Sequence, residues 1–173
     1  CISYEDLGTA IRYGQSWGDY PGYADRKAWE ERVAPEMKEI IIRNGEKALT
    51  HIWKPDLASD YLAFKRTGEI RTGRANHRAL QALTLAELVE GKGRFMDAII
   101  DGTWFLCETS WIHSAHLGFQ KDRSGLPDRN EPTIELVVAD IGAQIAWTYY
   151  FLKDEFDKVS PLINQRIVEE VPK

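Results

Sequence analysis

Apolar residues recur every three or four positions through most of the chain, and this spacing constrains the fold more than any other feature. Trp29, Val33 and Met37 show it clearly, because a four-residue step returns to the same face of an α-helix. No segment shows a sustained two-residue alternation bounded by turn residues, although Ile134–Val138 alone is compatible with a short strand. The pattern therefore predicts an all-α protein.

Capping residues and helix breakers divide this pattern into about seven helices. Asp25 is expected to cap a helix that runs to Arg43, is kinked by Pro35 and stops at Asn44-Gly45. The next helices are predicted at Glu46–Trp53, Leu57–Gly68, Arg74–Glu90, Phe95–Leu106, Thr133–Lys153 and from Ser160-Pro161 to about Val171. The long penultimate helix is apolar nearly all round and should be buried. Most connections are short, so neighbouring helices should form antiparallel hairpins.

The first 23 residues differ from the rest of the chain. They are predicted to form a short helix, Tyr4–Tyr13, and an aromatic loop, Gly14–Tyr23, whose glycines and proline disfavour a longer helix. We therefore divide the chain into this N-terminal segment (residues 1–23) and a helical domain (residues 24–173). A polar loop, Gln120–Pro132, interrupts the helical domain.

Composition excludes several classes of protein. The chain has 173 residues, of which 43% are hydrophobic, and this is enough for one domain with a sizeable core. Its formal charge of -5 argues against a general nucleic-acid binder. No apolar stretch is long enough to span a bilayer. Two cysteines make neither a disulfide scaffold nor a thiolate-rich zinc site.

The two cysteines have separate interpretations. Cys107 lies among apolar residues and is most simply a buried thiol. Cys1 is either the boundary of a fragment or the acylated first residue of a mature bacterial lipoprotein, and the residues that precede it would decide between the two.

The segment from Glu108 to Phe119 is the densest group of chemically useful side chains. A helix here would place His113 and His116 on one face, where either could transfer a proton near neutral pH and Glu108 could orient it. Trp111 and Phe119 could supply a flat apolar wall for a sugar ring. The alternative is a helix end whose histidines only satisfy loop carbonyls. The spacing matches no zinc motif, and no metal or other cofactor is predicted.

A basic stretch, Lys65–Arg78, is the second candidate site. Arg74 and Arg78 lie one helical turn apart, and their guanidinium groups could bind carboxylate or sulfate. The alternative is that these charges are simply solvated or, at Lys65 and Arg66, favour a helix C-terminus.

Short motifs then follow one another in a recognisable order between Asp56 and Val171. They are Arg66-Thr-Gly68, Arg78-Ala-Leu80, Leu85-Ala-Glu87, Gly91-Lys-Gly-Arg94-Phe95, Ile100-Asp101-Gly-Thr-Trp104, Cys107-Glu108-Thr-Ser-Trp111, Ala115-His116, Leu126-Pro-Asp128, Glu135-Leu136, and Phe156-Asp-Lys-Val-Ser160-Pro161 with Arg166. In this order the chain resembles the helical domain of heparinase II/III-like proteins, which are related to polysaccharide lyases.

The resemblance implies an incomplete (α/α) toroid of helical hairpins, usually followed by a β-sandwich, in a secreted or periplasmic bacterial protein. It implies β-elimination on an acidic, uronate-containing polysaccharide, in which a base removes the C5 proton, a cationic or polar group neutralises the carboxylate and an acid protonates the leaving oxygen.

The site residues follow from both the local pattern and the resemblance. His116 is expected to act as acid or base or to contact the carboxylate, with Glu108 beside it. Trp111 would stack on the sugar, Arg74 and Arg78 would bind anions, and His113 would contribute to binding, although it matches no family position. The tyrosine and second histidine of later hairpins have no counterpart here, so the chain alone should lack a complete active site. The alternatives are a non-catalytic helical module that binds a glycan or a protein, and an (α/α) glycoside hydrolase.

Overall fold

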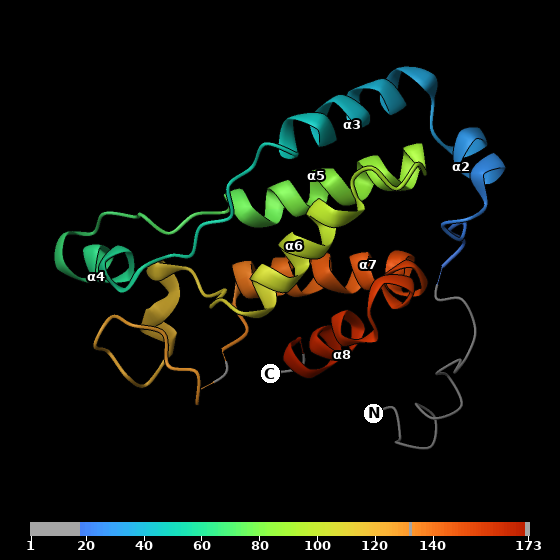
Figure 1. Cartoon of the computed structure of the whole chain (residues 1–173). Helices are drawn as coiled ribbons and strands as arrows, with labels where there is room; N and C mark the ends of the chain where they lie inside the picture. The colour runs from blue at the N-terminus through green and yellow to red at the C-terminus, as the bar shows by residue number, and fades with distance from the viewer. Residues whose placement is uncertain (1–17, 132, 172–173) are drawn as a thin grey trace, which may run out of the picture.

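The computed structural model describes residues 18–131 and 133–171, and within these ranges all of the regular structure is helical (Figure 1). The helices are α2 (Arg26–Arg32), α3 (Pro35–Ala48), α4 (Ala58–Thr67), α5 (Ala75–Glu90), α6 (Met96–Cys107), the 3-10 helix η1 (Ser114–Phe119), α7 (Leu136–Val159) and α8 (Pro161–Glu170). The prediction of an all-α protein is confirmed. The predicted helix Tyr4–Tyr13, most of the aromatic loop and Cys1 lie outside the described residues.

The predicted kinked helix from Asp25 to Arg43 is instead two helices. Asp25 caps α2 as expected, since its carboxylate accepts a hydrogen bond from the Ala28 N–H at 3.2 Å. The chain becomes extended at Val33, with φ -114° and ψ 116°, and Pro35 is the first residue of α3. A proline fits that position because the first helical N–H needs no partner within the helix.

Helix α3 then continues through Gly45, so the predicted stop at Asn44-Gly45 and the separate helix Glu46–Trp53 are both wrong. The reason lies in helix packing. A Cβ atom on Gly45 would lie 2.2 Å from the Cβ atom of Ala86 on α5. The glycine therefore permits the close approach of α3 and α5, which run side by side in Figure 1.

Helix α5 lies at the centre of the molecule and contacts α2, α3, α6 and α7. Its ends and those of α6 lie within one residue of the predicted bounds. Helices α7 and α8 form an antiparallel hairpin, in which α7 packs against α5 and α8 packs against α6 (Figure 1). The largest side chains with no exposed surface in this core are Leu80, Leu83, Phe95, Ile99, Ile145, Leu152 and Phe156. Cys107 is also buried, as predicted, and burial raises the pKa of its thiol to about 11.

Helix α7 differs from its prediction in its start and in its environment. It begins at Leu136 and runs to Val159, so the suggested strand at Ile134–Val138 is the start of a helix. Its buried residues form one stripe, Val137, Ile141, Ile145, Thr148, Leu152 and Phe156. Leu136 is 72% exposed, so this helix is amphipathic rather than buried all round.

A buried carboxylate fixes the turn between α5 and α6. Glu87 has no exposed surface and accepts hydrogen bonds from the Tyr23 hydroxyl (2.6 Å) and from the backbone N–H groups of Gly93 (2.7 Å) and Phe95 (3.1 Å). The hydrogen bond from Tyr23 also attaches the segment before α2 to the core. Among the described residues, no helix is both long and apolar enough to cross a membrane.

Candidate functional site

The two histidines lie together, but a helical face does not bring them together. Helix α6 ends at Cys107, and His113 is the capping residue before η1, where its Nδ1 atom accepts a hydrogen bond from the Ala115 N–H at 3.3 Å. His116 lies within η1, and the centroids of the two imidazole rings are 5.3 Å apart. The predicted pairing of His113 and His116 is thus realised by a cap and a 3-10 turn.

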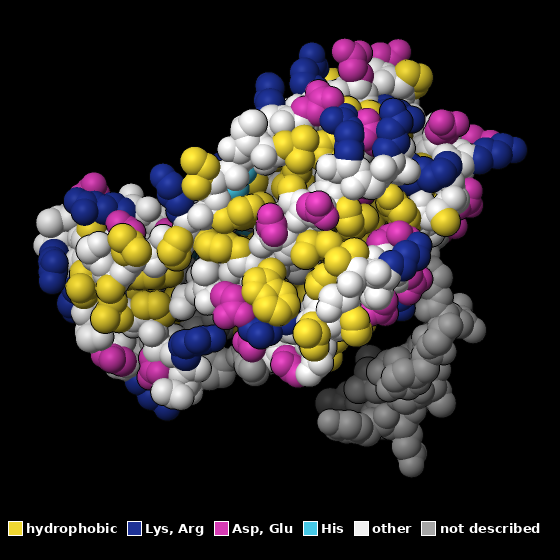
Figure 2. All heavy atoms as spheres, viewed as in Figure 1, with side chains coloured by type: hydrophobic (Ala, Val, Ile, Leu, Met, Phe, Trp, Pro, Cys, Tyr) yellow, Lys and Arg dark blue, Asp and Glu magenta, His cyan; other side chains and the backbone are white. Residues whose placement is uncertain are grey.

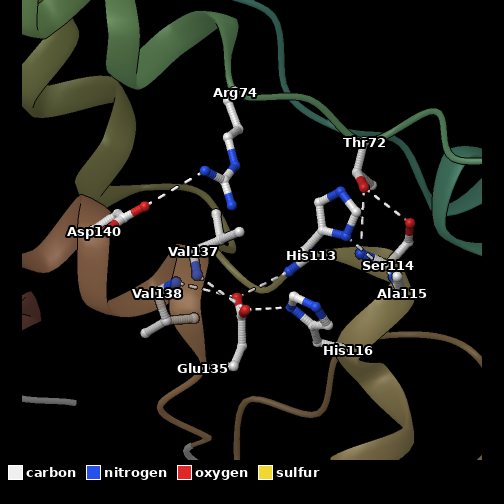
Figure 3. Close-up of polar contacts among 10 residues, drawn as sticks. All are labelled: Thr72, Arg74, His113, Ser114, Ala115, His116, Glu135, Val137, Val138 and Asp140. Carbon is white, nitrogen blue, oxygen red and sulfur yellow. Dashed lines mark hydrogen bonds and ion pairs between the residues drawn. The ribbon is translucent and has the colours of Figure 1, made fainter.

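Glu135 connects this histidine pair to α7 (Figure 3). Its carboxylate caps the helix, accepting hydrogen bonds from the N–H groups of Val137 (2.9 Å) and Val138 (3.1 Å). The same group accepts a bond from the His113 N–H at 3.3 Å and contacts the Nδ1 atom of His116. One buried side chain, 4% exposed, therefore fixes both the start of α7 and the position of the imidazole.

The surroundings of Glu135 favour its charged form. Burial opposes ionisation, but hydrogen bonds from the Val137 N–H, the His116 ring and the N–H groups of His113 and Val138 outweigh it. The pKa of the carboxyl is accordingly lower than usual. Glu135 is therefore a carboxylate near neutral pH, and it accepts rather than donates the hydrogen bond with the Nδ1 atom of His116.

In the neutral form of each imidazole, the hydrogen bonds place the proton on a different nitrogen atom. Because Nδ1 of His116 donates to a carboxylate, its Nε2 is the atom that can accept a proton. His113 is the reverse, because its Nδ1 already accepts a backbone N–H and its Nε2 therefore carries the proton. Burial lowers the pKa of His113, and His116 and Arg74 lower it further, which favours this neutral form. The His116 side chain is 28% exposed, so its ring is accessible to a ligand.

Arg74 brings a positive charge to the same place. It directly precedes the first turn of α5 and lies beside His113 in Figure 3. Its Nη1 atom is 3.5 Å from a carboxylate oxygen of Asp140 on α7, and its side chain is 37% exposed. An ion pair of that length and exposure is weak, so the guanidinium can exchange Asp140 for the carboxylate of a ligand.

Buried hydroxyl groups connect the segment before α5 to η1. The Thr72 and Ser114 hydroxyls are 2.9 Å apart, and the Ser114 N–H donates to the Thr72 hydroxyl at 3.2 Å. Thr72 lies two residues before Arg74, and Ser114 lies between the two histidines. The bond therefore fixes the arginine segment against η1.

The structure corrects the predicted role of Glu108. Its carboxylate pairs with Arg166 of α8, and that guanidinium also stacks over the Trp104 ring, 4.7 Å from its centroid. The carboxylate that positions His116 is Glu135. Glu108 thus ties the end of α6 to α8 rather than orienting the imidazole.

The two aromatic residues of the predicted wall have different environments. The Trp111 indole N–H donates to the Leu106 carbonyl at 2.7 Å, and the ring packs against the core and lines a separate cavity of about 470 Å³ with Ile112 and Arg129. Phe119 is 72% exposed, and its ring centroid is 6.1 Å from that of His116. Phe119, not Trp111, is the aromatic surface beside the histidines.

Arg74 and Arg78 do not act at one place. Arg74 faces the histidines, whereas Arg78 lines a groove between α3 and α5. Sequence reasoning also missed Glu135, although a glutamate directly before an apolar helical run is a signal for a cap.

In the ranges 18–131 and 133–171, no group of three His, Cys, Asp or Glu side chains is arranged to hold a metal ion. A scan of the chain against protein-family models finds no model that matches it.

Proposed function

We propose that this chain is the helical domain of a polysaccharide lyase-like protein and that it acts on, or binds, an acidic polysaccharide. The observation that carries the proposal is the Glu135–His116 pair with Arg74 and His113 beside it. In this proposal the helical hairpins form part of an (α/α) toroid. The order of motifs between Asp56 and Val171 supports that arrangement.

His116 is the base of the proposed reaction. Its Nε2 atom takes the C5 proton of a uronate, and the C–H electron pair moves toward the adjacent carboxylate. Glu135 stabilises the imidazolium that forms and keeps the ring in the Nδ1–H tautomer, as the carboxylate of a serine protease triad does for its histidine.

Arg74 and His113 make that proton acidic enough to be removed. A uronate carboxylate next to the guanidinium has its charge neutralised, and this stabilises the negative charge that develops as the proton leaves. The Nε2–H group of His113 offers a second hydrogen bond to the same carboxylate. The acid that protonates the leaving oxygen is supplied, in this proposal, by a segment outside those described.

Phe119 provides the surface on which a sugar ring lies. Sugar rings present C–H groups on one face, and an exposed aromatic ring binds that face while polar groups bind the hydroxyls. Phe119 takes the role that the sequence assigned to Trp111. A secreted or periplasmic location, a lipid anchor at Cys1 and a downstream β-sandwich domain belong to the same proposal.

A titration of the chain with oligogalacturonate tests the proposal. We expect Arg74→Gln and Phe119→Ala each to weaken binding at least tenfold, because one removes the carboxylate partner and the other the stacking surface. Arg43→Gln, an exposed cation on α3, should leave affinity within twofold of wild type. Equal affinity in all four proteins, or no binding by any, refutes the site.

A second function has its own support. Ile134 and Leu136, on either side of Glu135, are 85% and 72% exposed, and with Phe119 they place apolar surface around the polar pair. A non-catalytic module that binds a glycan would have the same features. Binding without removal of the C5 proton would identify this alternative.

A further inference from the structure

A groove of about 840 Å³ lies between the C-terminal half of α3 and the N-terminal half of α5. Alanines from both helices line it, namely Ala48, Ala75, Ala79 and Ala82. Small side chains leave space between two helices that otherwise pack closely, as they do at Gly45. The groove is thus a product of the sequence of both helices.

The segment that leaves α3 forms one wall of the groove and is held in place. The Nε2 atom of His51 is 2.8 Å from the side-chain oxygen of Asn76 on α5, and the Asn76 amide donates to the Lys54 carbonyl at 2.8 Å. Trp53 anchors the same segment to the core, since a Cβ atom on Gly102 of α6 would lie 2.4 Å from its ring. The wall is therefore preorganised.

Four basic side chains from four different segments line this groove: Lys47, Lys54, Arg71 and Arg78. Arg71 is paired with Glu69 at 2.7 Å. Within the part of the chain that the structure describes, Lys47, Lys54 and Arg78 make no ion pair with a carboxylate. The groove thus holds three cations that form no ion pair among the described residues, in a protein whose net charge is -5.

The acidic residues in the groove offset this positive charge only in part. Asp60 accepts a hydrogen bond from the Leu57 N–H at 2.8 Å, at the start of α4. Asp56 is partly buried, and with Asp60 it places two carboxyl groups in the groove against the four basic side chains. An anionic ligand therefore meets a net positive field in the groove.

We propose that this groove is a second binding site, distinct from the histidine site, for the sulfate or carboxylate groups of an acidic sugar chain. Arg78 offers a planar fork to such an anion, and Lys47 and Lys54 offer point charges. That the ligand is a polysaccharide rests on the proposed function. Arg74 directly precedes α5 and Arg78 lies one turn further along, so one chain bound at the histidines can continue along that helix into the groove.

Calorimetric titration of the full chain tests this inference with two probes. Hexagalacturonate carries carboxylates only, and a heparin hexasaccharide carries sulfates as well. We expect Lys47→Gln/Lys54→Gln/Arg78→Gln to weaken the binding of at least one probe tenfold or more and to reduce its salt dependence. The matched control is Lys27→Gln/Lys121→Gln/Lys153→Gln, which removes the same charge from exposed positions and should stay within twofold of wild type. Equal losses in both triple variants overturn the inference, since they would show only a long-range effect of net charge.

The result separates this inference from the proposed function. His116→Ala and Arg74→Gln should leave the groove contribution intact, so the groove variant should still weaken heparin binding in either background. Loss of affinity at the histidine site only, with no effect of the groove variant, overturns the groove and leaves the proposed function standing. Binding of a single-stranded oligonucleotide that is tighter than that of both sugars, and equally sensitive to the groove variant, overturns the assignment to sugar acids.

Discussion

The buried carboxylate of Glu135 caps the first turn of α7, and the Oε2 atom that accepts a hydrogen bond from the Val137 N–H also contacts the Nδ1 atom of His116. The same side chain therefore couples the formation of α7 to the position of the His116 imidazole. The docking of η1 on the start of α7 sets the tautomer of the imidazole, and the cap keeps the carboxylate ionised.

We predict that neutral His116 is in the Nδ1–H tautomer and that neutral His113 is in the Nε2–H tautomer. The contact with Glu135 and the bond from the Ala115 N–H require these states. Ring ¹⁵N shifts in a long-range ¹H–¹⁵N spectrum distinguish the two. Glu135→Gln should mix the tautomers of His116 and leave those of His113 unchanged, and an Nε2–H tautomer for both rings in wild type would show that the pair is not formed.

Glu135→Ala should lower the free energy of unfolding by about 2 kcal/mol near neutral pH, because it removes a helix cap and the partner of a buried N–H. The pKa of Glu135 in the folded state lies below its usual value of 4.5, so the carboxylate stabilises the fold above that pH. The difference between wild type and variant should therefore shrink as the pH falls below 4.5 and through the folded-state pKa.

Ser160→Ala is the control for this pH dependence. Ser160 caps α8 by accepting a hydrogen bond from the Leu162 N–H at 3.3 Å, and its hydroxyl does not titrate in this range. Its cost in unfolding free energy, measured by urea denaturation, should not change between pH 7 and pH 4. A cost of Glu135→Ala that is equally constant with pH would rule out the ionised cap.

Gly45→Ala should destabilise the protein by about 1–3 kcal/mol, although alanine is the better helix former. The added methyl group meets Ala86, at 2.2 Å from its Cβ atom, and α3 and α5 must move apart. Gly118→Ala provides the comparison, since an added Cβ atom there has no neighbour within 4 Å. Thermal denaturation of both variants checks the prediction, and a stabilised Gly45→Ala protein would mean that the two helices are not in close contact.

Tyr23→Phe should cost about 1–2 kcal/mol of unfolding free energy, because it removes a hydrogen bond to the buried carboxylate of Glu87. Tyr149→Phe is the matched control, since the Tyr149 hydroxyl makes no hydrogen bond within the described ranges. Chemical denaturation of both proteins makes the comparison. Equal effects of the two substitutions would indicate that Tyr23 contributes only its ring.

Local signals predicted helices well where they act within one helix. The bounds of α5 and α6 follow from their flanking glycines and apolar spacing. Gly45 was misread because a glycine can stop a helix or allow a close contact, and only the position of Ala86 decides between them. The same limit applies to α7, whose exposed face depends on what covers it.

The site could be predicted only in part, for a similar reason. The proximity of His113 and His116 is local and was found from spacing. Glu135 lies nineteen residues beyond His116, and their contact depends on how η1 docks on α7. Glu108 is closer in sequence, yet the end of α6 directs it toward Arg166. Closeness along the chain was therefore a poor guide to which carboxylate would orient the imidazole.

Exchange of the C5 proton of a uronate tests the central claim most directly, because it needs only the base and the carboxylate partner that these residues supply. The chain is incubated with oligogalacturonate in D₂O, and the H5 signal is followed by ¹H NMR. We predict that the signal decays with wild type. Its rate of decay should be at least 100-fold lower with His116→Ala and with Glu135→Gln. An H5 signal that persists with wild type, or that decays equally fast with His116→Ala, would contradict the account.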